Sequence, residues 1–547
     1  MRLSRPTSHA ATRLAALVAS LSVVLALGAA PGGAAPASGD GDDAAAKGAA
    51  TAPGVARAEA ALARVQAIFA TDGSRSAGRV PVGTRVDATM ALRELANTRS
   101  RLSGDDRAAA EALLKRPTSS GGDGTLSYGS VKEAPPSCTP DLCVHYVRSG
   151  KHAPALRDAN GNGVPDYVDL ARTTLTDVHD TYLRAGYREP KPDGTRGGNA
   201  KIDVYIGDIG DQGVYGYCTS DEPEPDPTPS SFDRWAYCVL DEDYSEFPTN
   251  TPKENLQVTA AHEYFHATQF AYDRYEDAWL LEATATWAED ELYDGVDDNV
   301  QYLRSSQMAR PRVPLDTFDQ TGIQYGTWSF FRFLTEKYTT SRGGLPTLVL
   351  DIWRKADGRR GAPDLYSWQA VDRVLKARGT TGAAQLAAYG AANRRSQAAY
   401  DEGRANRYPT APLGARRTLT TSSRVLSAST RLRHLTTWTA RVQPASAAPK
   451  DWRLRVAVDL GPRNRGQVAL VTVYPRQGAA RVMKLGLGPA GVGSKVLAFG
   501  PGQTKAVEVT VANGSGRFTC WTGDPYSCAG TPLDDNVLEK VTLTAFR

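Results

Sequence analysis

A helix with a complete start signal constrains the fold of this chain more than any other feature. Thr251 is followed by Pro252 at the first helical position and by Glu254 three residues after the cap, which together form a capping box. The stretch that follows, LQVTAAHEYFHATQFAYD, contains no Gly or Pro, so the helix is predicted to continue to Asp273. Any fold of the chain must accommodate one long helix here.

This helix carries the pattern H-E-x-x-H at His262, Glu263 and His266. Residues four positions apart lie on one helical face with Cβ atoms about 5–6 Å apart, so both imidazoles can reach one zinc ion. Glu263 points toward the open coordination position, where it can serve as a general base. Because a catalytic zinc takes three protein ligands, a third ligand is expected on a neighbouring element. The alternative is a long helix whose two histidines bind no metal.

The segment WLLEATATWAE follows at residues 279–289. Together with the H-E-x-x-H helix it resembles the gluzincin metallopeptidases, whose next helix supplies a Glu from a W-L-x-E-G-x-A-x-[YW]-x-E segment. It resembles more closely a group of secreted bacterial metalloproteases of that superfamily. The resemblance covers roughly residues 138–338. It implies a zincin-like domain in which His262, His266 and Glu282 hold zinc and Glu289 is the trailing acid.

The segment departs from the family pattern in two respects. Fifteen residues separate His266 from Glu282, a shorter connection than in the aminopeptidase and thermolysin-like branches, and Ala283 stands where those often have Gly. The alternative third ligands are Asp273, Glu276, Asp277 and Glu289. In gluzincins a Tyr from a later helix often donates to the oxyanion, and Tyr325 is the candidate by its order along the chain. A packed core tyrosine is the other interpretation of Tyr325.

A second metal-binding pattern, DANGNGVPDYVD, spans residues 158–169. In the register of a calcium loop, oxygen ligands fall at positions 1, 3, 5, 7, 9 and 12, with Gly at position 6. The predicted calcium ligands are Asp158, Asn160, Asn162, the backbone carbonyl of Val164, Asp166 and Asp169. Position 12 is Asp, as in dockerin-type repeats, where most such loops have Glu. We expect a structural Ca²⁺ ion here, and a polar turn without metal is the alternative.

The N-terminus predicts export. Three arginines precede an apolar run from Leu14 to Ala30, and an A-x-A site follows at residues 35–37, which is the pattern of a cleaved secretory signal. No second long apolar stretch follows, and no Cys follows the signal to carry a lipid anchor. We therefore expect a secreted, extracellular protein without a membrane anchor.

Six cysteines fall into three couples that are close in sequence: Cys138 with Cys143, Cys218 with Cys238, and Cys520 with Cys528. An even number of cysteines in an exported chain predicts disulfides. The pairing within each couple is inferred from proximity alone. If it holds, no free thiol remains for a cysteine nucleophile.

The chain is expected to divide into four regions: a signal peptide at 1–37, a pro-region or N-terminal helical segment at 38–135, a zincin-like metalloprotease domain at 136–410, and a C-terminal β-sandwich at 411–547. Helices are predicted at 55–70 and 87–116, the latter broken at Ser103-Gly104. Strands at 144–148 and 202–206, a helix at 169–185 and a Pro-rich loop at 223–229 follow. Short alternating runs at 454–458, 468–473 and 506–511 favour the sandwich. The predicted fold is thus an α+β zincin-like domain, with a mixed sheet and active-site helices, flanked by these two regions.

These features favour a secreted zinc-dependent endopeptidase acting on protein or peptide substrates as a monomer. The net charge of +4 provides no global field for nucleic acid. Residues 221–300 contain 21 acidic and three basic residues, which is typical of a solvated face and is also where hard cations would bind. The alternative function is a secreted binding or adhesion protein built on a catalytically degenerate zincin scaffold.

Overall fold

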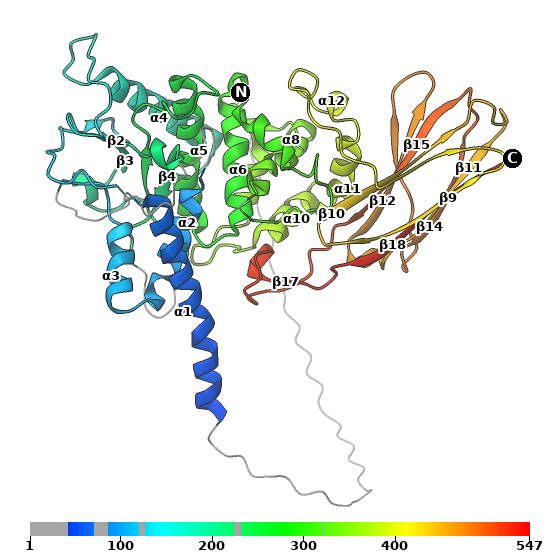
Figure 1. The fold of residues 1–547 in the computed structure, drawn as a ribbon, viewed down its shortest axis with the longest axis horizontal. Helices are drawn as coiled ribbons and strands as arrows, with labels where there is room; N and C mark the ends of the chain where they lie inside the picture. Colours follow the sequence, from blue (N-terminus) through cyan, green and yellow to red (C-terminus); the bar gives the residue numbers. More distant parts are fainter. Residues whose placement is uncertain (1–41, 71–85, 120–125, 224–230, 320) are drawn as a thin grey trace, which may run out of the picture. The chain divides into compact units, whose positions relative to one another are not determined.

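The computed structural model describes residues 42–70, 86–119, 126–223, 231–319 and 321–547, with side chains from residue 54 onward. The chain forms two compact units, Met1–Ala52 and Pro53–Arg547. The larger unit combines helices with several sheets and is α+β (Figure 1). The predicted signal peptide lies outside the described residues, and so does most of the predicted Pro-rich loop.

The first sheet has five strands in the order β1-β2-β3-β5-β4. Its strands are β1 (Ser137–Cys138), β2 (Leu142–His145), β3 (Ile202–Ile206), β4 (Gly216–Thr219) and β5 (Tyr237–Leu240). β2, β3 and β5 are parallel, whereas β1 and β4 are antiparallel to their neighbours and form the edges. The prediction for β3 is confirmed, the strand predicted at 144–148 is found earlier as β2, and the helix between them, α4 (Asp166–Ala185), also begins earlier than predicted.

Two long helices, α5 (Pro252–Asp273) and α6 (Ala278–Leu292), pack on each other, and α5 also contacts β4 and β5. Thr251 caps α5 as predicted: its Oγ1 accepts from Glu254 N at 3.3 Å, and its own N donates to Glu254 Oε2 at 2.8 Å. Both helices are buried on almost every side. The helices that follow are α7 (Ile323–Gly326), α8 (Trp328–Lys337), α9 (Thr347–Trp353), α10 (Ser367–Ala377), α11 (Gly382–Asn393) and α12 (Ser396–Ala399).

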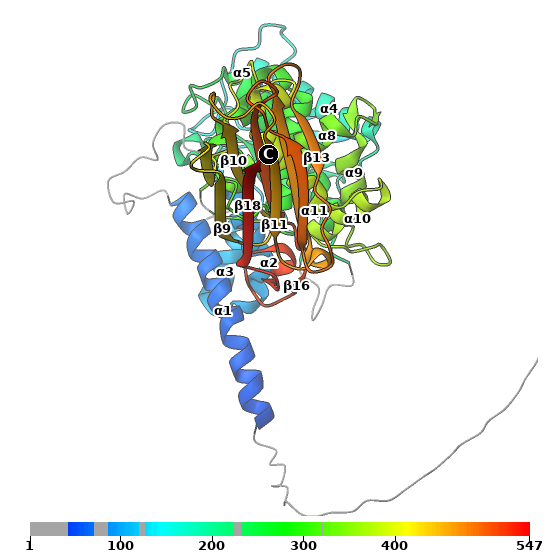
Figure 2. The same cartoon turned by 90° about the vertical axis from the view of Figure 1, so that its right-hand side faces the viewer.

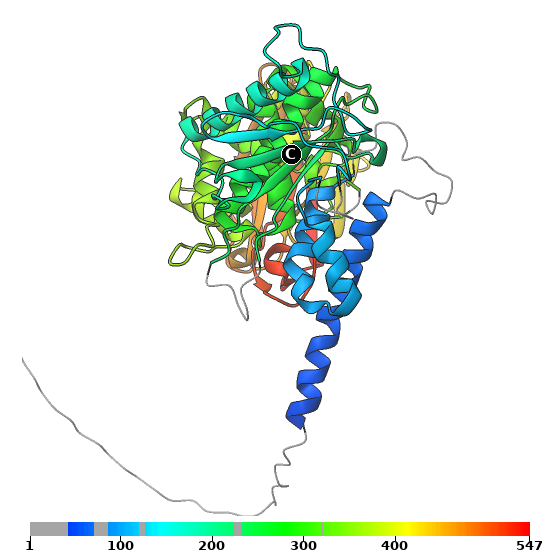
Figure 3. The same ribbon diagram turned by 90° about the vertical axis from the view of Figure 1, so that its left-hand side faces the viewer.

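Three N-terminal helices are α1 (Asp42–Phe69), α2 (Ala88–Thr98) and α3 (Gly104–Leu113). The part of α1 from Pro53 onward and α2 share a hydrophobic core with one face of the five-stranded sheet (Figure 3). The alternation of the strands divides their side chains between two cores: Tyr205, Tyr237 and Val239 face the N-terminal helices, whereas Val204 and Cys238 belong to the core that contains α5. α1 therefore covers the sheet face opposite α5, whereas α2 lies against the edge strand β4, and its Met90 belongs to the core that contains α5.

The C-terminal part contains two sheets that share one apolar core (Figure 2). Their strand orders are β13-β12-β15-β10-β8 and β14-β11-β18-β9. The strands are β8 (Ala415–Leu419), β9 (Val425–Leu432), β10 (Thr436–Pro444), β11 (Arg453–Asp459), β12 (Gln467–Pro475), β13 (Arg481–Lys484), β14 (Val492–Ala498), β15 (Thr504–Asn513) and β18 (Val537–Phe546). The predicted strands fall within β11, β12 and β15. Two short hairpins complete the larger unit: β6 (Ser341–Arg342) with β7 (Leu345–Pro346), and β16 (Phe518–Thr519) with β17 (Thr531–Pro532).

Polar contacts join the C-terminal sheets to the helical part. The imidazole of His434 lies between two carboxylates, with Nε2 3.0 Å from Asp316 Oδ1 and Nδ1 2.9 Å from Asp535 Oδ1. Ser527 Oγ donates to the other oxygen of Asp316 at 2.8 Å. His434 and Asp316 are completely buried and Asp535 is partly exposed, so these groups form a largely buried polar contact between the two parts.

The predicted disulfide pairing is confirmed: the three bonds are Cys138–Cys143, Cys218–Cys238 and Cys520–Cys528. The second of them joins the edge strand β4 to β5, directly beside α5. Among the described residues, no helix is both long and apolar enough to cross a membrane.

Candidate metal centre

α5 brings the two predicted histidine ligands together. His262 and His266 turn their Nε2 atoms toward each other at 3.0 Å, as the spacing on one helical face requires. Their exposed fractions are 1% and 0%. Two imidazoles that converge through the same nitrogen in a buried space are arranged as ligands of one ion.

α6 supplies the carboxylate. Glu282 Oε2 lies 3.3 Å from His262 Nε2, and Glu282 Oε1 lies 3.3 Å from His266 Nε2. Both oxygens are buried and lack a hydrogen-bond partner among the described residues. One ligand atom from each of these three residues lies within 4.8 Å of the others. A buried carboxylate without a donor costs free energy unless a cation compensates it, so this group has the chemistry of a metal site.

The remaining imidazole nitrogens are held by two further side chains. His262 Nδ1 lies 2.5 Å from Glu289 Oε1, and His266 Nδ1 lies 2.7 Å from Gln269 Oε1. The amide of Gln269 is itself fixed, because its Nε2 donates to Leu281 O at 2.9 Å and to Thr284 Oγ1 at 3.0 Å. An acceptor at each Nδ1 holds the proton there and orients both Nε2 atoms toward Glu282, the arrangement in which imidazoles bind a metal.

The alternative third ligands lie in other contacts. Asp273 accepts a hydrogen bond from Tyr275 N at 2.7 Å, Glu276 from Ser367 N at 3.1 Å and Asp277 from Cys528 N at 2.7 Å. Glu289 reaches the Nδ1 side of His262 and not the side where the Nε2 atoms converge. Of the five acids considered from the sequence, the structure brings Glu282 to both histidines.

The electrostatics of the group follow from its burial. Burial would raise the pKa of Glu282, but the adjacent His266 and His262 more than offset this effect and hold that pKa below its usual value. Asp87, at the N-terminus of α2, responds in the opposite sense: burial, and then repulsion by Glu282, raise its pKa to about 7. Two carboxylates from distant parts of the chain therefore share one electrostatic environment.

Glu263 lies beside the group of His262, His266 and Glu282 and is 3% exposed. Its Oε2 accepts a hydrogen bond from Thr89 Oγ1 of α2 at 2.9 Å. The edge strand β4 approaches it closely, since a Cβ added at Gly216 would lie 3.0 Å from Glu263 Cγ. The contacts of Thr89 and Asp87 were not predicted, and no local sequence pattern signals them.

Tyr325, in α7, lies near the group: its ring centroid is 6.2 Å from that of His262. It also packs against Tyr302 at 5.0 Å between ring centroids and is 5% exposed. The position is thus compatible with both interpretations of this residue, a neighbour of the reacting atoms and a packed core tyrosine.

The predicted calcium loop forms a tight turn held by its own side chains. Asp158 accepts from the backbone N of Asn162 and Gly163 at 3.2 and 2.8 Å, and Asp169 Oδ2 accepts from Asn162 Nδ2 at 2.7 Å. Gly163, at position 6, has φ +85°, a conformation that favours glycine. In the described part of the chain, three groups of His and acidic atoms lie within 4.8 Å of one another, and the carboxylates of this loop are not one of them.

The other two acidic groups have different surroundings. Asp241, Asp243 and Glu246 form one group, within the acidic stretch noted in the sequence. Asp290, Asp294 and Glu402 form the other, and Arg332 pairs with each of them at 3.0–3.6 Å. The single guanidinium of Arg332 partly offsets the charge of the second group.

Comparisons with known proteins identify no family. No family model matches the chain, and no curated protein matches it. One solved structure, a family GH115 4-O-methyl-α-glucuronidase with specificity for decorated arabinogalactans, shares 10% identity with it. The match covers 56% of this chain and 45% of that enzyme, less than half its length, with a TM-score of 0.13. A likeness this weak carries no argument about fold or function.

Proposed function

We propose that the chain is a secreted zinc-dependent endopeptidase of the gluzincin type. The observation that carries the proposal is the buried group of His262, His266 and Glu282 with Glu263 beside it. The proposal includes a zincin-like fold for the α+β part, a β-sandwich for the two C-terminal sheets, and extracellular protein or peptides as substrates. The three disulfides support an oxidising compartment.

The residues present fit zinc. Two imidazole nitrogens and one carboxylate converge, which is a ligand set of catalytic zinc sites with one position left open. The unpartnered oxygens of Glu282 and the acceptors at both Nδ1 atoms support this assignment. Zinc bound there would polarise the scissile carbonyl and acidify a water molecule.

Glu263 is proposed as the general base. It would take the proton from the attacking water and return it to the leaving amine nitrogen. Glu289 and Gln269 would keep the two imidazoles in the required tautomer and orientation. Tyr325, near His262, is proposed to donate a hydrogen bond to the oxyanion of the tetrahedral intermediate.

The test combines metal content with turnover. The zinc-loaded chain should cleave casein before or after removal of its N-terminal segment, and a chelator should abolish the cleavage. Glu263→Gln should retain zinc and lose about 10²–10⁴-fold in turnover, because the base is lost while the ligands remain. Glu189→Gln makes the same chemical change at an exposed position and should behave as wild type.

Two outcomes would contradict the proposal. If the activity of Glu263→Gln lies within about tenfold of wild type, Glu263 is not the general base, because the loss expected for that role is larger. Zinc bound by the wild-type chain without any turnover, even after N-terminal processing, would instead support a binding or adhesion protein on a degenerate scaffold.

A further inference from the structure

The metal centre is closed to substrate in this chain. His262, Glu263, His266 and Glu282 are exposed by 1%, 3%, 0% and 1%. A peptide bond can be hydrolysed only if it reaches Glu263 and the metal ligands. The N-terminal segment contributes to this closure, because α2 contacts β4 and its Thr89 touches Glu263.

The hydroxyl of Thr89 makes hydrogen bonds with two groups that a peptide substrate would need. Its hydroxyl donates to Glu263 Oε2 at 2.9 Å, the carboxylate assigned to accept the proton of water. The same hydroxyl accepts from Cys218 N of β4 at 3.0 Å. β4 is an edge strand, and unpaired N–H groups of an edge are where an extended peptide pairs with a sheet. One side chain of 3% exposure thus blocks both the base and part of the edge.

Asp87 adds a buried carboxyl group to the same place. Its Oδ1 caps α2 by accepting from Met90 N at 2.9 Å, whereas its Oδ2 is buried without a hydrogen-bond partner among the described residues. Upstream of the cap, Val86 N donates to Gly213 O at 2.9 Å. The start of α2 is therefore fixed against the loop that leads into β4.

We infer that α2 is a built-in inhibitor that holds this chain in a latent state by occupying the place of the peptide substrate at Glu263 and β4. The inference rests on the proposed function and adds to it a residue-level account of latency. It assigns Thr89 as the blocking side chain and the rest of the N-terminal segment as the means of holding it there.

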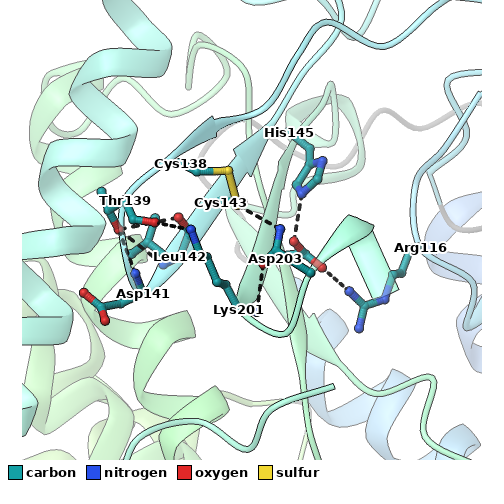
Figure 4. The surroundings of a disulfide bond; sticks show 10 residues. Arg116, Cys138, Thr139, Asp141, Leu142, Cys143, His145, Lys201 and Asp203 are labelled. Carbon is teal, nitrogen blue, oxygen red and sulfur yellow. Dashed lines mark hydrogen bonds and ion pairs between the residues drawn. A yellow bond between two sulfur atoms is a disulfide. The ribbon is translucent and has the colours of Figure 1, made fainter. Parts of the chain in front are cut away.

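Two buried arginines fasten the segment. Arg93, on α2, donates from Nε to Arg274 O at 2.5 Å and from Nη2 to Glu276 O, so it binds the turn between α5 and α6. Arg116, after α3, lies among three acids of the sheet region: Asp203, Asp193 at 2.7 Å and Asp221 at 3.0 Å. Figure 4 shows its contact with Asp203. The exposed fractions of Arg93 and Arg116 are 7% and 8%.

The contacts of Arg93 and Arg116 determine how the N-terminal segment can dissociate from the rest of the chain. Displacing Arg116 would leave its buried acids without their counter-charge, which is strongly unfavourable. Displacing Arg93 would break its charged hydrogen bonds to two backbone carbonyls. Cutting the chain would therefore leave α2 in place unless Arg93 and Arg116 are also displaced. Weakening the contacts of Arg93 or Arg116 in the uncut chain should instead expose the site at Glu263.

The experiment uses the full, zinc-loaded chain and two readouts: the rate at which a chelator extracts zinc, and the rate of casein hydrolysis. Arg93→Gln should raise both rates by about tenfold or more, because it replaces charged hydrogen bonds that resist local opening. Thr89→Val keeps the side-chain volume and should raise both rates less. Arg101→Gln, the same change at an exposed position, is the matched control and should leave both rates unchanged.

The two readouts separate the possible failures. If zinc leaves the wild-type chain as fast as it leaves Arg93→Gln and Thr89→Val, α2 does not close the site and the inference is wrong. If extraction accelerates in the variants while no variant hydrolyses casein, closure by α2 stands and the endopeptidase proposal fails. If Arg93→Gln does not fold, as circular dichroism would show, Thr89→Val decides the question by itself.

Discussion

Each histidine of the proposed metal centre is oriented through Nδ1, the nitrogen that points away from the other histidine. Glu289 holds His262 from α6, while Gln269 holds His266 from within α5. Glu282, which lies seven positions before Glu289 on α6, faces the opposite side of His262. The two acids of one helix therefore have different roles, and substitutions can tell them apart.

Glu282→Ala should abolish tight zinc binding, because it removes a ligand from a site of three. Glu289→Ala should weaken it only by about 10–100-fold, the usual cost of losing a partner that orients a ligand. Competition with a chromophoric chelator measures both affinities. If Glu289→Ala strips the metal and Glu282→Ala does not, the two roles are reversed and the ligand assignment is wrong.

Residues that local sequence could identify are those whose partners lie on the same or the next helix. The spacing in α5 places His262, Glu263 and His266 together, and the motif in α6 singles out Glu282. Thr89 could not be found in this way, because its contact with Glu263 spans 174 positions and depends on how α2 packs against the sheet. Gln269 was visible three positions after His266, but its role depends on donors in α6.

Elements were predicted well where a local signal defines their ends. The capping box fixed the start of α5, and the alternation in the C-terminal region located β11, β12 and β15. The strand β2 was displaced by a few residues because it is buried along its whole length and so shows no alternation. The break in the N-terminal hairpin was predicted at Ser103-Gly104, and the structure places a short 3-10 turn, Arg99–Arg101, before it.

The loop between β2 and α4 provides a test at this scale. Ca²⁺ should raise the melting temperature, because an ion that binds only the folded chain adds about 2.7 kcal/mol at a hundredfold excess over its dissociation constant. Asp158→Ala should remove this shift and leave zinc content unchanged, since hard oxygen ligands compete poorly for zinc. Differential scanning calorimetry with and without Ca²⁺ measures the shift.

Asp243→Ala is the control for the loop, because Asp243 belongs to the group of Asp241, Asp243 and Glu246 in the acidic stretch. If the calcium response persists in Asp158→Ala and disappears in Asp243→Ala, the ion binds in the acidic stretch instead. In that case the hydrogen bonds from Asn162 and Gly163 to Asp158 describe a metal-free polar turn.

At the scale of the whole molecule, His434 is the charge that joins the C-terminal sheets to the helices. Burial alone would lower its pKa, but Asp316 and Asp535 more than offset that effect and raise the pKa from 6.5 to about 9. Tyr526, whose ring packs on the imidazole, and Arg433, which donates to the Tyr526 hydroxyl, are the other titratable groups beside it. The contact between the C-terminal sheets and the helical part therefore contains a histidine that stays charged at neutral pH.

The pH dependence of stability follows in sign from this shift. A group whose pKa is raised on folding stabilises fully below its unfolded pKa, and the contribution is lost as pH rises through the folded value. His434→Gln should therefore cost most near about pH 6, on the order of 3 kcal/mol, and much less above about pH 9. Urea unfolding of both proteins across this range measures the difference. A cost that does not vary with pH would show that the charge of His434 does not contribute.

The position of the N-terminal helices also sets an order of events during synthesis. A chain emerges from its N-terminus, so the residues of α1 and α2 are synthesised before those of β3, β4 and β5. The sheet face formed by Tyr205, Tyr217, Tyr237 and Val239 thus meets its cover as soon as it assembles. The helical segment that we propose as an inhibitor would then also serve, earlier, as a surface on which the sheet assembles.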